Sequence, residues 1–378
     1  MKIHPSEAFE QFRSAGINFF TGVPDSLLKS FCAYAGDKLN HNEHIIAANE
    51  GSSIAIASGH YLATSSPSLV YMQNSGIGNA VNPLLSLASP EVYSVPMIVL
   101  VGWRGEPGLQ DEPQHMLQGE IMPDLLNAMK IPWFELSSSQ HRPSQVIAQA
   151  IDRMHELCSP VVLLVRKNTF KDYQSKYLPP KIHSLSREQA IHLITKNLDK
   201  NDLIVSTTGM ASRELFECRK TSEGTLCEDF LTVGSMGHAS SIAAGIAMKK
   251  PDRKVICIDG DGAFLMHMGA AGIIGQSNLS NYIHIVLNNG AHDSVGGQPT
   301  VAFDLSLVTI ANGCGYKITS CVSSENELVS ELVRLRNEKG PVFLEVLICR
   351  GSRPDLGRPT SSPYDNKISF MKKVSLRS

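Results

Sequence analysis

The sequence predicts an α/β protein built from two doubly wound parallel-sheet domains. Short apolar runs alternate with helical patterns along both halves of the chain, and continuous apolar strands of this kind are typical of parallel sheets covered on both faces. A polar stretch that contains Pro179-Pro180 separates the two halves. The length of 378 residues also suits two cores, because single cores rarely grow beyond about 250 residues.

The expected elements follow in chain order. In the first half, apolar runs predict strands at residues 16–21, 44–48, 68–73, 96–102 and 160–166. The second half begins with a helix, because Ser186 and Gln189 have capping-box spacing. Its strands are predicted at 203–206, 254–259, 282–288 and 341–348. The domains are therefore expected at 1–172 and 186–349, with a linker at 173–185 and a tail at 350–378 that can fold over the sheet edge.

Composition excludes several classes of partner. Lys plus Arg number 34 and Asp plus Glu number 36, so no basic field attracts nucleic acid or an anionic membrane. No apolar run approaches the ~18 residues that a membrane span needs. The eight cysteines are scattered and never form C-x-x-C, which is typical of reduced thiols. We therefore expect a cytoplasmic protein that binds small neutral or anionic ligands.

Polar residues follow two neighbouring strands of the second half. Gly260-Asp261-Gly262 comes directly after one strand, and Asn288-Asn289 ends the next. Open parallel sheets bind ligands at the carboxyl ends of their strands, and oxygen donors suit a hard cation such as Mg²⁺. Either motif alone is a common turn signal. Both together, at this spacing, favour a functional site.

This pair of motifs resembles the binding signature of the thiamine-diphosphate-dependent enzymes. The resemblance implies bound thiamine diphosphate and Mg²⁺, with Asp261, the side chain of Asn289 and the carbonyl of Ala291 as metal ligands. It also implies that Gly260 and Gly262 contact the cofactor.

Two upstream segments strengthen the resemblance. Gly234-Ser235-Met236-Gly237 matches the family segment that supports the aminopyrimidine, which would make Met236 the side chain wedged between the two cofactor rings. By residue type alone, Met236 would be a core methionine. Thr207-Thr208-Gly209 matches a loop that contacts the diphosphate, so Thr208 and Gly209 are expected there.

Glu50 is the candidate for the acidic group that activates the cofactor. It follows the apolar run 44–48 and precedes a helix of small residues. In the family, a carboxyl group at such a position hydrogen-bonds the aminopyrimidine ring, and surroundings of low polarity keep the proton shared. As an isolated residue, Glu50 would instead be a helix-start residue favoured by the helix dipole.

Three further residues are candidates for contacts with the reacting atoms. Gly22–Asp25 resembles a family turn in which an acidic residue approaches the substrate, although Asp25 can equally cap a helix beginning at Ser26. His115 follows the strand at 96–102 and is a candidate proton donor, and His292 has similar standing. A lone loop histidine is more often solvated and idle.

The short linker, with no middle domain, is similar to that of the compact two-domain decarboxylases. Almost the full length resembles the phosphonopyruvate decarboxylase family, and the sulfopyruvate decarboxylases resemble it less closely. The resemblance implies a pyrimidine-binding domain followed by a diphosphate-binding domain, and at least a homodimer with active sites between chains. It also implies conversion of 3-phosphonopyruvate into phosphonoacetaldehyde and carbon dioxide in phosphonate biosynthesis, with sulfopyruvate or another 2-oxo acid as the alternative substrate.

Arginines are the candidates for binding the phosphonate, because their planar donors bind its oxygens in pairs. We expect Arg104 and Arg353 in this role, although any single loop arginine is more often solvated. A dinucleotide enzyme is disfavoured because residues 76–81 lack the third glycine of its fingerprint. A non-catalytic thiamine-diphosphate-binding protein would not need the combination of Glu50, Asp261 and Asn289.

Overall fold

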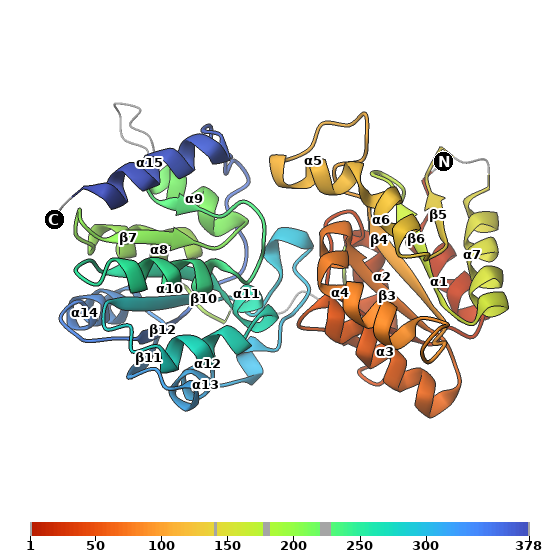
Figure 1. The fold of residues 1–378 in the computed structure, drawn as a ribbon, viewed down its shortest axis with the longest axis horizontal. Coiled ribbons are helices and arrows are strands. Elements are labelled where there is room, and N and C mark those ends of the chain that lie inside the picture. Colours follow the sequence, from red (N-terminus) through yellow and green to blue (C-terminus); the bar gives the residue numbers. More distant parts are fainter. Residues whose placement is uncertain (1, 140–141, 177–181, 220–227, 377–378) are drawn as a thin grey trace. The chain divides into compact units, whose positions relative to one another are not determined.

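The computed structural model describes residues 2–139, 142–176, 182–219 and 228–376. The chain divides into two compact units, residues 1–179 and 180–378, and each is built on a six-stranded parallel sheet (Figure 1). Within the described residues, no helix is long and apolar enough to cross a membrane.

The first unit has the strand order β2-β1-β3-β4-β6-β5. Its strands are β1 (Phe19–Gly22), β2 (His44–Ile46), β3 (Ser68–Gln73), β4 (Met97–Gly102), β5 (Trp133–Leu136) and β6 (Pro160–Val165). Its helices are α1 (Pro5–Ser14), α2 (Lys29–Lys38), α3 (Glu50–Thr64), η1 (Asn74–Gly76), α4 (Ile77–Pro83), η2 (Leu84–Ala88), α5 (Pro113–Glu120), α6 (Met122–Ala128) and α7 (Pro143–Leu157).

The second unit has the strand order β8-β7-β9-β10-β12-β11. Its strands are β7 (Leu203–Ser206), β8 (Phe230–Leu231), β9 (Val255–Gly260), β10 (Tyr282–Asn288), β11 (Ile318–Val322) and β12 (Val342–Leu347). Its helices are α8 (Arg187–Lys196), α9 (Met210–Arg219), α10 (Ala239–Lys249), α11 (Asp261–Met266), α12 (Gly269–Gln276), η3 (Asp293–Val295), η4 (Ala302–Asp304), α13 (Leu307–Cys314), α14 (Glu325–Arg336) and α15 (Pro363–Ser375). Counted along the chain, the strands of both sheets have the order 2-1-3-4-6-5.

Helices cover both faces of each sheet, as the continuous apolar strands predicted. In β4, Ile98 and Leu100 belong to the core that contains residues of α1, α2 and α7, whereas Met97, Val99 and Val101 belong to the core on the side of α3 and α6. Successive strand residues point to opposite faces, so both sides of the strand are apolar. The predicted fold of two doubly wound parallel-sheet domains is confirmed.

Every strand predicted from the sequence is present, and three further strands were missed: β5, β8 and β11. All three lie at an end of their sheet. Most of their residues are partly exposed, so no continuous apolar run marks them in the sequence.

The segment 350–378 contains a helix that the sequence analysis did not expect. Phe370 on α15 is buried in the core of the second unit, in ring contact with Phe230 of β8. Asn366 accepts a hydrogen bond from Leu231 N and donates one to Asp229 O. The end of the described chain is therefore part of the second unit's packing. The predicted capping box of Ser186 and Gln189 is present at the start of α8.

Candidate active site

Glu50 is the first residue of α3 and is buried, with 5% of its surface exposed. Asn79 Nδ2 donates a hydrogen bond of 2.7 Å to Glu50 Oε2. The carboxyl group also packs against Gly76, where an added Cβ would lie only 2.6 Å from Glu50 Cδ. The Glu50 carboxyl is thus held by a side chain from α4 and lies against a glycine whose replacement would displace it.

Asn79 and Gly76 were not predicted as site residues. They lie in the run 76–81, which served only to exclude a dinucleotide fingerprint. A glycine followed three residues later by an asparagine carries no recognisable signal by itself, because the partner of both residues is distant in the sequence.

Asp25 is completely buried in the turn after β1, and burial raises its pKa to about 6. Its Oδ2 accepts hydrogen bonds from the N–H groups of Leu27 (2.7 Å) and Leu28 (3.2 Å). Its Oδ1 has no hydrogen-bond partner within the described part of the chain. The helix α2 begins at Lys29, so the expected helix start at Ser26 is wrong, and Asp25 caps only the turn before it. One carboxyl oxygen of Asp25 therefore caps the turn, and the other is available to a ligand.

Arg104 lies two residues after the end of β4 and close to Asp25. Its positive charge lowers the pKa of Asp25 and so opposes part of the rise that burial causes. Its guanidinium binds Asp111 through two hydrogen bonds, of 2.7 Å and 2.5 Å, and donates to Ser26 Oγ at 3.0 Å. Asn74 bonds both the N–H and the carbonyl of Arg104. The arginine is therefore fixed beside Asp25 by partners from three segments.

His115 lies near the start of α5 in a largely desolvated position. Burial, with a smaller contribution from Arg104, lowers its pKa to about 4. The ring is therefore neutral at neutral pH and can donate only an N–H. Among the described residues, neither His115 Nδ1 nor Gln114 Oε1 has a hydrogen-bond partner.

In the second unit, Asp261 begins α11 with 3% of its surface exposed. Burial raises the pKa of Asp261 to about 6. Hydrogen bonds from Thr300 Oγ1 and from backbone N–H groups, including those of Gly262 and Asn289, lower the pKa and oppose part of this rise. The bond from Thr300 is 2.5 Å long. Its hydrogen-bond partners in the described chain are neutral, so this buried carboxylate suits a bound cation.

Asn289 follows β10, and its carboxamide has both ends fixed. Oδ1 accepts from Ala291 N at 3.0 Å, and Nδ2 donates to Asp293 Oδ2 at 2.6 Å. Arg350 donates to the carbonyls of Asn289 (3.2 Å) and Gly290 (2.9 Å), which holds the loop. The residues predicted as metal ligands thus offer a carboxylate, an amide oxygen and a backbone carbonyl, the donor types that Mg²⁺ prefers.

Met236 is presented by a tight turn after β8. Its neighbours Ser235 and Gly237 both have left-handed backbone conformations, with φ of 53° and 83°. A Cβ on Gly262 would lie 3.4 Å from Met236 Cε and 3.0 Å from His292 Cε1, so these two side chains converge on the Gly260-Asp261-Gly262 turn. Gly234 and Met236 are partly exposed and Ser235 is exposed.

The Thr207-Thr208-Gly209 loop follows β7. Thr208 Oγ1 donates to Val233 O at 2.8 Å, which ties this loop to the segment before Gly234. A Cβ on Gly209 would lie 3.7 Å from Ser294 Cβ, so the loop also approaches the segment after Asn289. The second unit therefore brings its predicted cofactor-binding segments together at the carboxyl ends of its strands.

Buried polar atoms without partners mark the same regions. Within the described residues, such atoms occur on Thr21, Asp25, Gln114, His115, Thr207, His267, Gln298 and Ser320. Buried polar groups are rarely left unpaired in folded proteins. Most of these lie in or beside the segments described above, as expected where a ligand completes the hydrogen bonding. Gln298, whose amide N and O are both unpaired, was not predicted.

Two family matches cover much of both units. Residues 8–128 match the N-terminal TPP binding domain of thiamine pyrophosphate enzymes, and residues 207–346 match their C-terminal TPP binding domain. The chain is 30% identical to phosphonopyruvate decarboxylases from Streptomyces viridochromogenes, over 93% of this chain and 89% of that protein, and from Streptomyces hygroscopicus, over 96% and 92%. It is 26% identical to a sulfopyruvate decarboxylase from Methanosarcina acetivorans, over 93% of this chain and 92% of that protein.

The chain belongs to the thiamine-diphosphate-dependent 2-oxo acid decarboxylases. The predicted family and enzyme class are confirmed, and thiamine diphosphate is the cofactor for which both domains are built.

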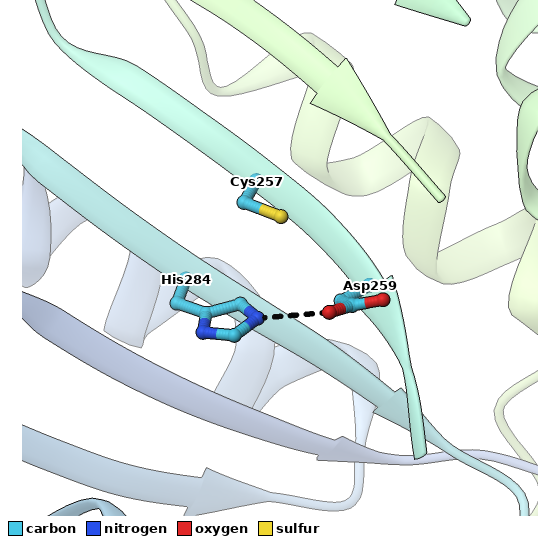
Figure 2. Close-up of side chains that lie close together, drawn as sticks. All are labelled: Cys257, Asp259 and His284. Carbon is cyan, nitrogen blue, oxygen red and sulfur yellow. Dashed lines mark hydrogen bonds and ion pairs between the residues drawn. The ribbon is translucent and has the colours of Figure 1, made fainter. Parts of the chain in front are cut away.

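One cluster of this decarboxylase resembles a metal site but is satisfied without a metal. Cys257 and Asp259 on β9 and His284 on β10 have potential ligand atoms within 4.8 Å of one another (Figure 2). His284 bonds Asp259 Oδ2 (3.2 Å) and Tyr316 Oη (3.0 Å) through its two ring nitrogens. Asp259 Oδ1 accepts from Gly260 N at 2.9 Å. The cluster therefore holds the turn that leads into Asp261.

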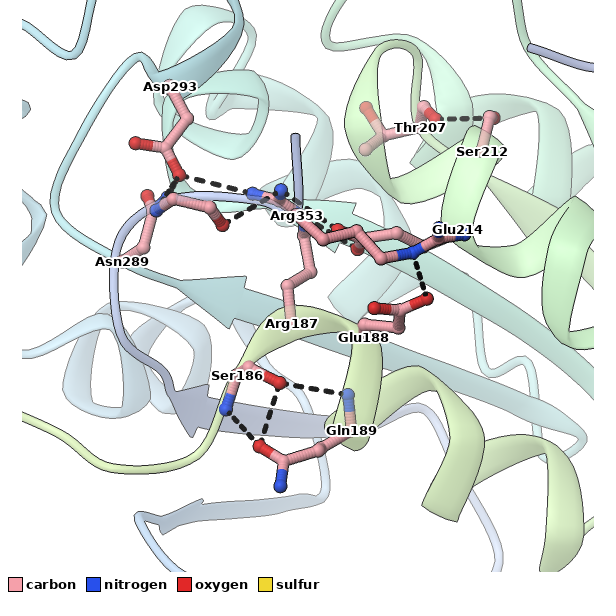
Figure 3. Close-up of polar contacts among 11 residues, drawn as sticks. Ser186, Arg187, Glu188, Gln189, Thr207, Ser212, Glu214, Asn289, Asp293 and Arg353 are labelled. Atoms are coloured by element: carbon pink, nitrogen blue, oxygen red, sulfur yellow. Dashed lines mark hydrogen bonds and ion pairs between the residues drawn. The ribbon is translucent and has the colours of Figure 1, made fainter. Parts of the chain in front are cut away.

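The two remaining predicted substrate residues differ in their surroundings. Burial lowers the pKa of His292 to about 4, so its ring is neutral beside Met236 and Gly262. Arg353 instead pairs with Glu188 at 3.0 Å (Figure 3). It also pairs with Asp355 at 2.9 Å and with Glu217. Three carboxylates surround this guanidinium, whereas Arg104 has one carboxylate partner, Asp111, so Arg353 is the weaker candidate for binding a phosphonate.

Proposed function

We propose that the chain decarboxylates 3-phosphonopyruvate to phosphonoacetaldehyde and carbon dioxide, a step of phosphonate biosynthesis. The observation that carries this proposal is the 30% identity to two phosphonopyruvate decarboxylases over almost the full length of both. Sulfopyruvate is the second candidate, because a sulfopyruvate decarboxylase is 26% identical over a similar span. Both substrates carry an anionic group on the carbon next to the keto group, so a cationic side chain must decide between them and pyruvate.

The cofactor would be held by the second unit. Asp261, Asn289 and the Ala291 carbonyl would bind Mg²⁺, which neutralises the diphosphate. Cofactor contacts are assigned to Thr208, Gly209, Gly234, Ser235, Met236, Gly260 and Gly262. When bound, thiamine diphosphate supplies an electron sink that accepts the bonding pair as carbon dioxide leaves.

Glu50 would hold a shared proton against the aminopyrimidine ring. Its burial and its bond to Asn79 support this role, because a fixed carboxyl in a site of low polarity can pass a proton without rearranging. Gly76 supports it sterically, since any side chain there would displace the carboxyl group.

Asp25 would deliver the proton to the carbon that loses carbon dioxide. A carboxyl group with a pKa of about 6 is partly protonated near neutral pH, and its Oδ1 is available. His115, neutral at that pH, would act as a hydrogen-bond donor in the same step. Arg104 would contact the phosphonate together with the Ser26 hydroxyl, which it already bonds.

We further propose that the working unit is at least a homodimer with active sites between chains. The resemblance to the family implies this organisation, and Glu50 and Asp261 belong to different units of the chain. Recovery of activity when Glu50→Gln chains are mixed with Asp261→Ala chains tests this assembly.

Release of carbon dioxide from phosphonopyruvate, sulfopyruvate and pyruvate tests the substrate. The proposal expects the highest kcat/KM for phosphonopyruvate and a poor rate with pyruvate, which lacks the phosphonate that Arg104 would bind. A higher kcat/KM with sulfopyruvate would replace the proposed substrate and leave the reaction class unchanged.

A further inference from the structure

A chain of ion pairs in the second unit ends on the side chain of Asn289 (Figure 3). Asp293 Oδ2 accepts from Asn289 Nδ2 at 2.6 Å and from Arg187 Nη1 at 3.3 Å. Arg187 in turn binds both carboxyl oxygens of Glu214, at 2.8 Å and 3.1 Å. We propose that Asp293, Arg187 and Glu214 are positioning residues that turn the Asn289 amide oxygen toward the divalent cation and thereby set the affinity for it. This inference rests on the metal site of the proposed function.

The orientation of Asn289 is the property that matters, because the two ends of a carboxamide have the same shape and only the oxygen binds a cation. A carboxylate accepts hydrogen bonds and donates none when ionised. Asp293 therefore selects the NH₂ end of Asn289 and leaves Oδ1 on the opposite side. Oδ1 accepts one bond, from Ala291 N, and keeps its second lone pair for the cation.

Asp293 can exert this control because it is itself held from several sides. Its side chain is 13% exposed, and Oδ2 accepts a third bond from Gly351 N at 2.8 Å. Gly351 also accepts from Arg187 Nη2 at 3.3 Å. The start of the segment after β12 and the start of α8 thus fix Asp293 together.

Arg187 is fixed by the pair with Glu214, and both side chains are buried, 8% and 1% exposed. Burial raises the pKa of Glu214, and the adjacent charge of Arg187 opposes that rise. Removing one member of such a buried group leaves an uncompensated charge.

The experiment measures cation binding to the cofactor-saturated protein. Mn²⁺ serves as the probe and is counted by electron paramagnetic resonance, with Mg²⁺ competing. Asp293→Ala should weaken cation binding by about 10–100-fold, as is typical when a partner behind a metal ligand is removed. At saturating Mg²⁺, kcat should return close to that of the wild type, because none of the three residues contacts the reacting atoms. Asp293→Asn, which keeps an acceptor oxygen, should show a smaller loss.

Glu331→Gln is the matched control, since its side chain is 15% exposed, close to the 13% of Asp293, and it removes a carboxylate from an ion pair with Arg334 on α14. It should leave cation binding unchanged. If Asp293→Ala does not fold, as judged by its thermal melt, Arg187→Lys provides the same measurement with the ion pair weakened.

Asp261→Ala separates the two claims. Loss of cation binding in Asp261→Ala, with wild-type cation affinity in folded Asp293→Ala or Arg187→Lys, overturns the positioning role and leaves the metal site standing. Retained cation binding in Asp261→Ala overturns the metal site itself, and the positioning role with it.

Discussion

After the third strand of each sheet, counted along the chain, the first unit has Asn74-Ser75-Gly76 and the second has Gly260-Asp261-Gly262. After the second strand, the first unit reaches Glu50 and the second unit reaches Met236. The strand order is the same in both sheets, so these turns occupy corresponding positions. In the first unit the third-strand turn makes room for the Glu50 carboxyl, whereas in the second it supplies Asp261 itself. One topology thus supports two different chemistries.

Asp25 and Asp261 sharpen this comparison because burial raises the pKa of both to about 6. Asp25 lies beside Arg104 and keeps one oxygen without a partner in the described residues, which suits proton transfer. Asp261 is surrounded by neutral donors from Thr300 and the backbone, which suits a cation. The partners, and not the burial, decide what each carboxyl does.

The largest expected effect is on turnover in Glu50→Gln. The amide cannot share a proton with the aminopyrimidine, so kcat should fall by about 10²–10⁴-fold, the usual contribution of a positioned acid or base. Cofactor affinity should stay within an order of magnitude. Single-turnover release of carbon dioxide and calorimetric cofactor titration measure the two quantities, and wild-type turnover would remove Glu50 from the mechanism.

Asp261→Ala should instead act on cofactor binding. It removes the only carboxylate proposed for the metal, so Mg²⁺-dependent cofactor binding should be lost. Intrinsic fluorescence during cofactor titration, with and without Mg²⁺, follows this directly. Equal cofactor affinity under both conditions would show that the second unit does not bind through a metal.

Gly76→Ala should reduce activity by about 100-fold while the fold is retained, because a displacement of about 1 Å in a catalytic group can cost this much. The new Cβ would lie 2.6 Å from Glu50 Cδ. Gly78→Ala, two residues further along in α4, is the matched control, since no atom lies within 4 Å of its added Cβ. Comparable kcat values for the two variants would contradict the steric role of Gly76.

Glu50, Asp261 and Asn289 could be proposed from the sequence because each lies at the end of an apolar run in a recognisable local motif. Their supports could not be proposed, because those residues come from distant segments. Asn79 bonds Glu50 across 29 positions, and Arg187 bonds Asp293 across 106. Arg353 was assigned to the substrate because its sequence neighbours do not reveal Glu217 and Glu188, which neutralise it. Three of the four edge strands, β5, β8 and β11, were missed for a similar reason, since their partly exposed residues lack a local apolar pattern.

Arg104→Lys should lower kcat/KM for phosphonopyruvate about tenfold or more, because a charge-assisted paired contact is worth about 1.5–3 kcal/mol. Decarboxylation of pyruvate should hardly change. Arg353→Lys is the comparison, and its three carboxylate partners predict a much smaller effect. The opposite ranking of the two variants would move phosphonate recognition from Arg104 to Arg353.

The smallest expected change is in the pH dependence of stability, which comes from the raised pKa of Asp25. Its pKa rises from 3.8 to about 6 on folding, so its contribution favours the folded state fully below about pH 4 and is lost as the pH rises through 6. Asp25→Asn should remove this decline, which thermal melts between pH 4 and 7 would reveal. The same variant should lower kcat, because an amide cannot deliver the proton, and its residual activity should lack the limb near pH 6 in the kcat profile. Parallel melting curves for both proteins would contradict the raised pKa.

Mixing two inactive chains tests most directly the claim that each unit supplies half of a site shared between chains. Glu50→Gln and Asp261→Ala should each be inactive alone. When they are co-expressed, half of randomly formed dimers contain both chains, and each of these has one intact site of two, so about a quarter of wild-type activity is expected. No recovery in mixed dimers isolated by two different affinity tags would contradict a site shared between chains.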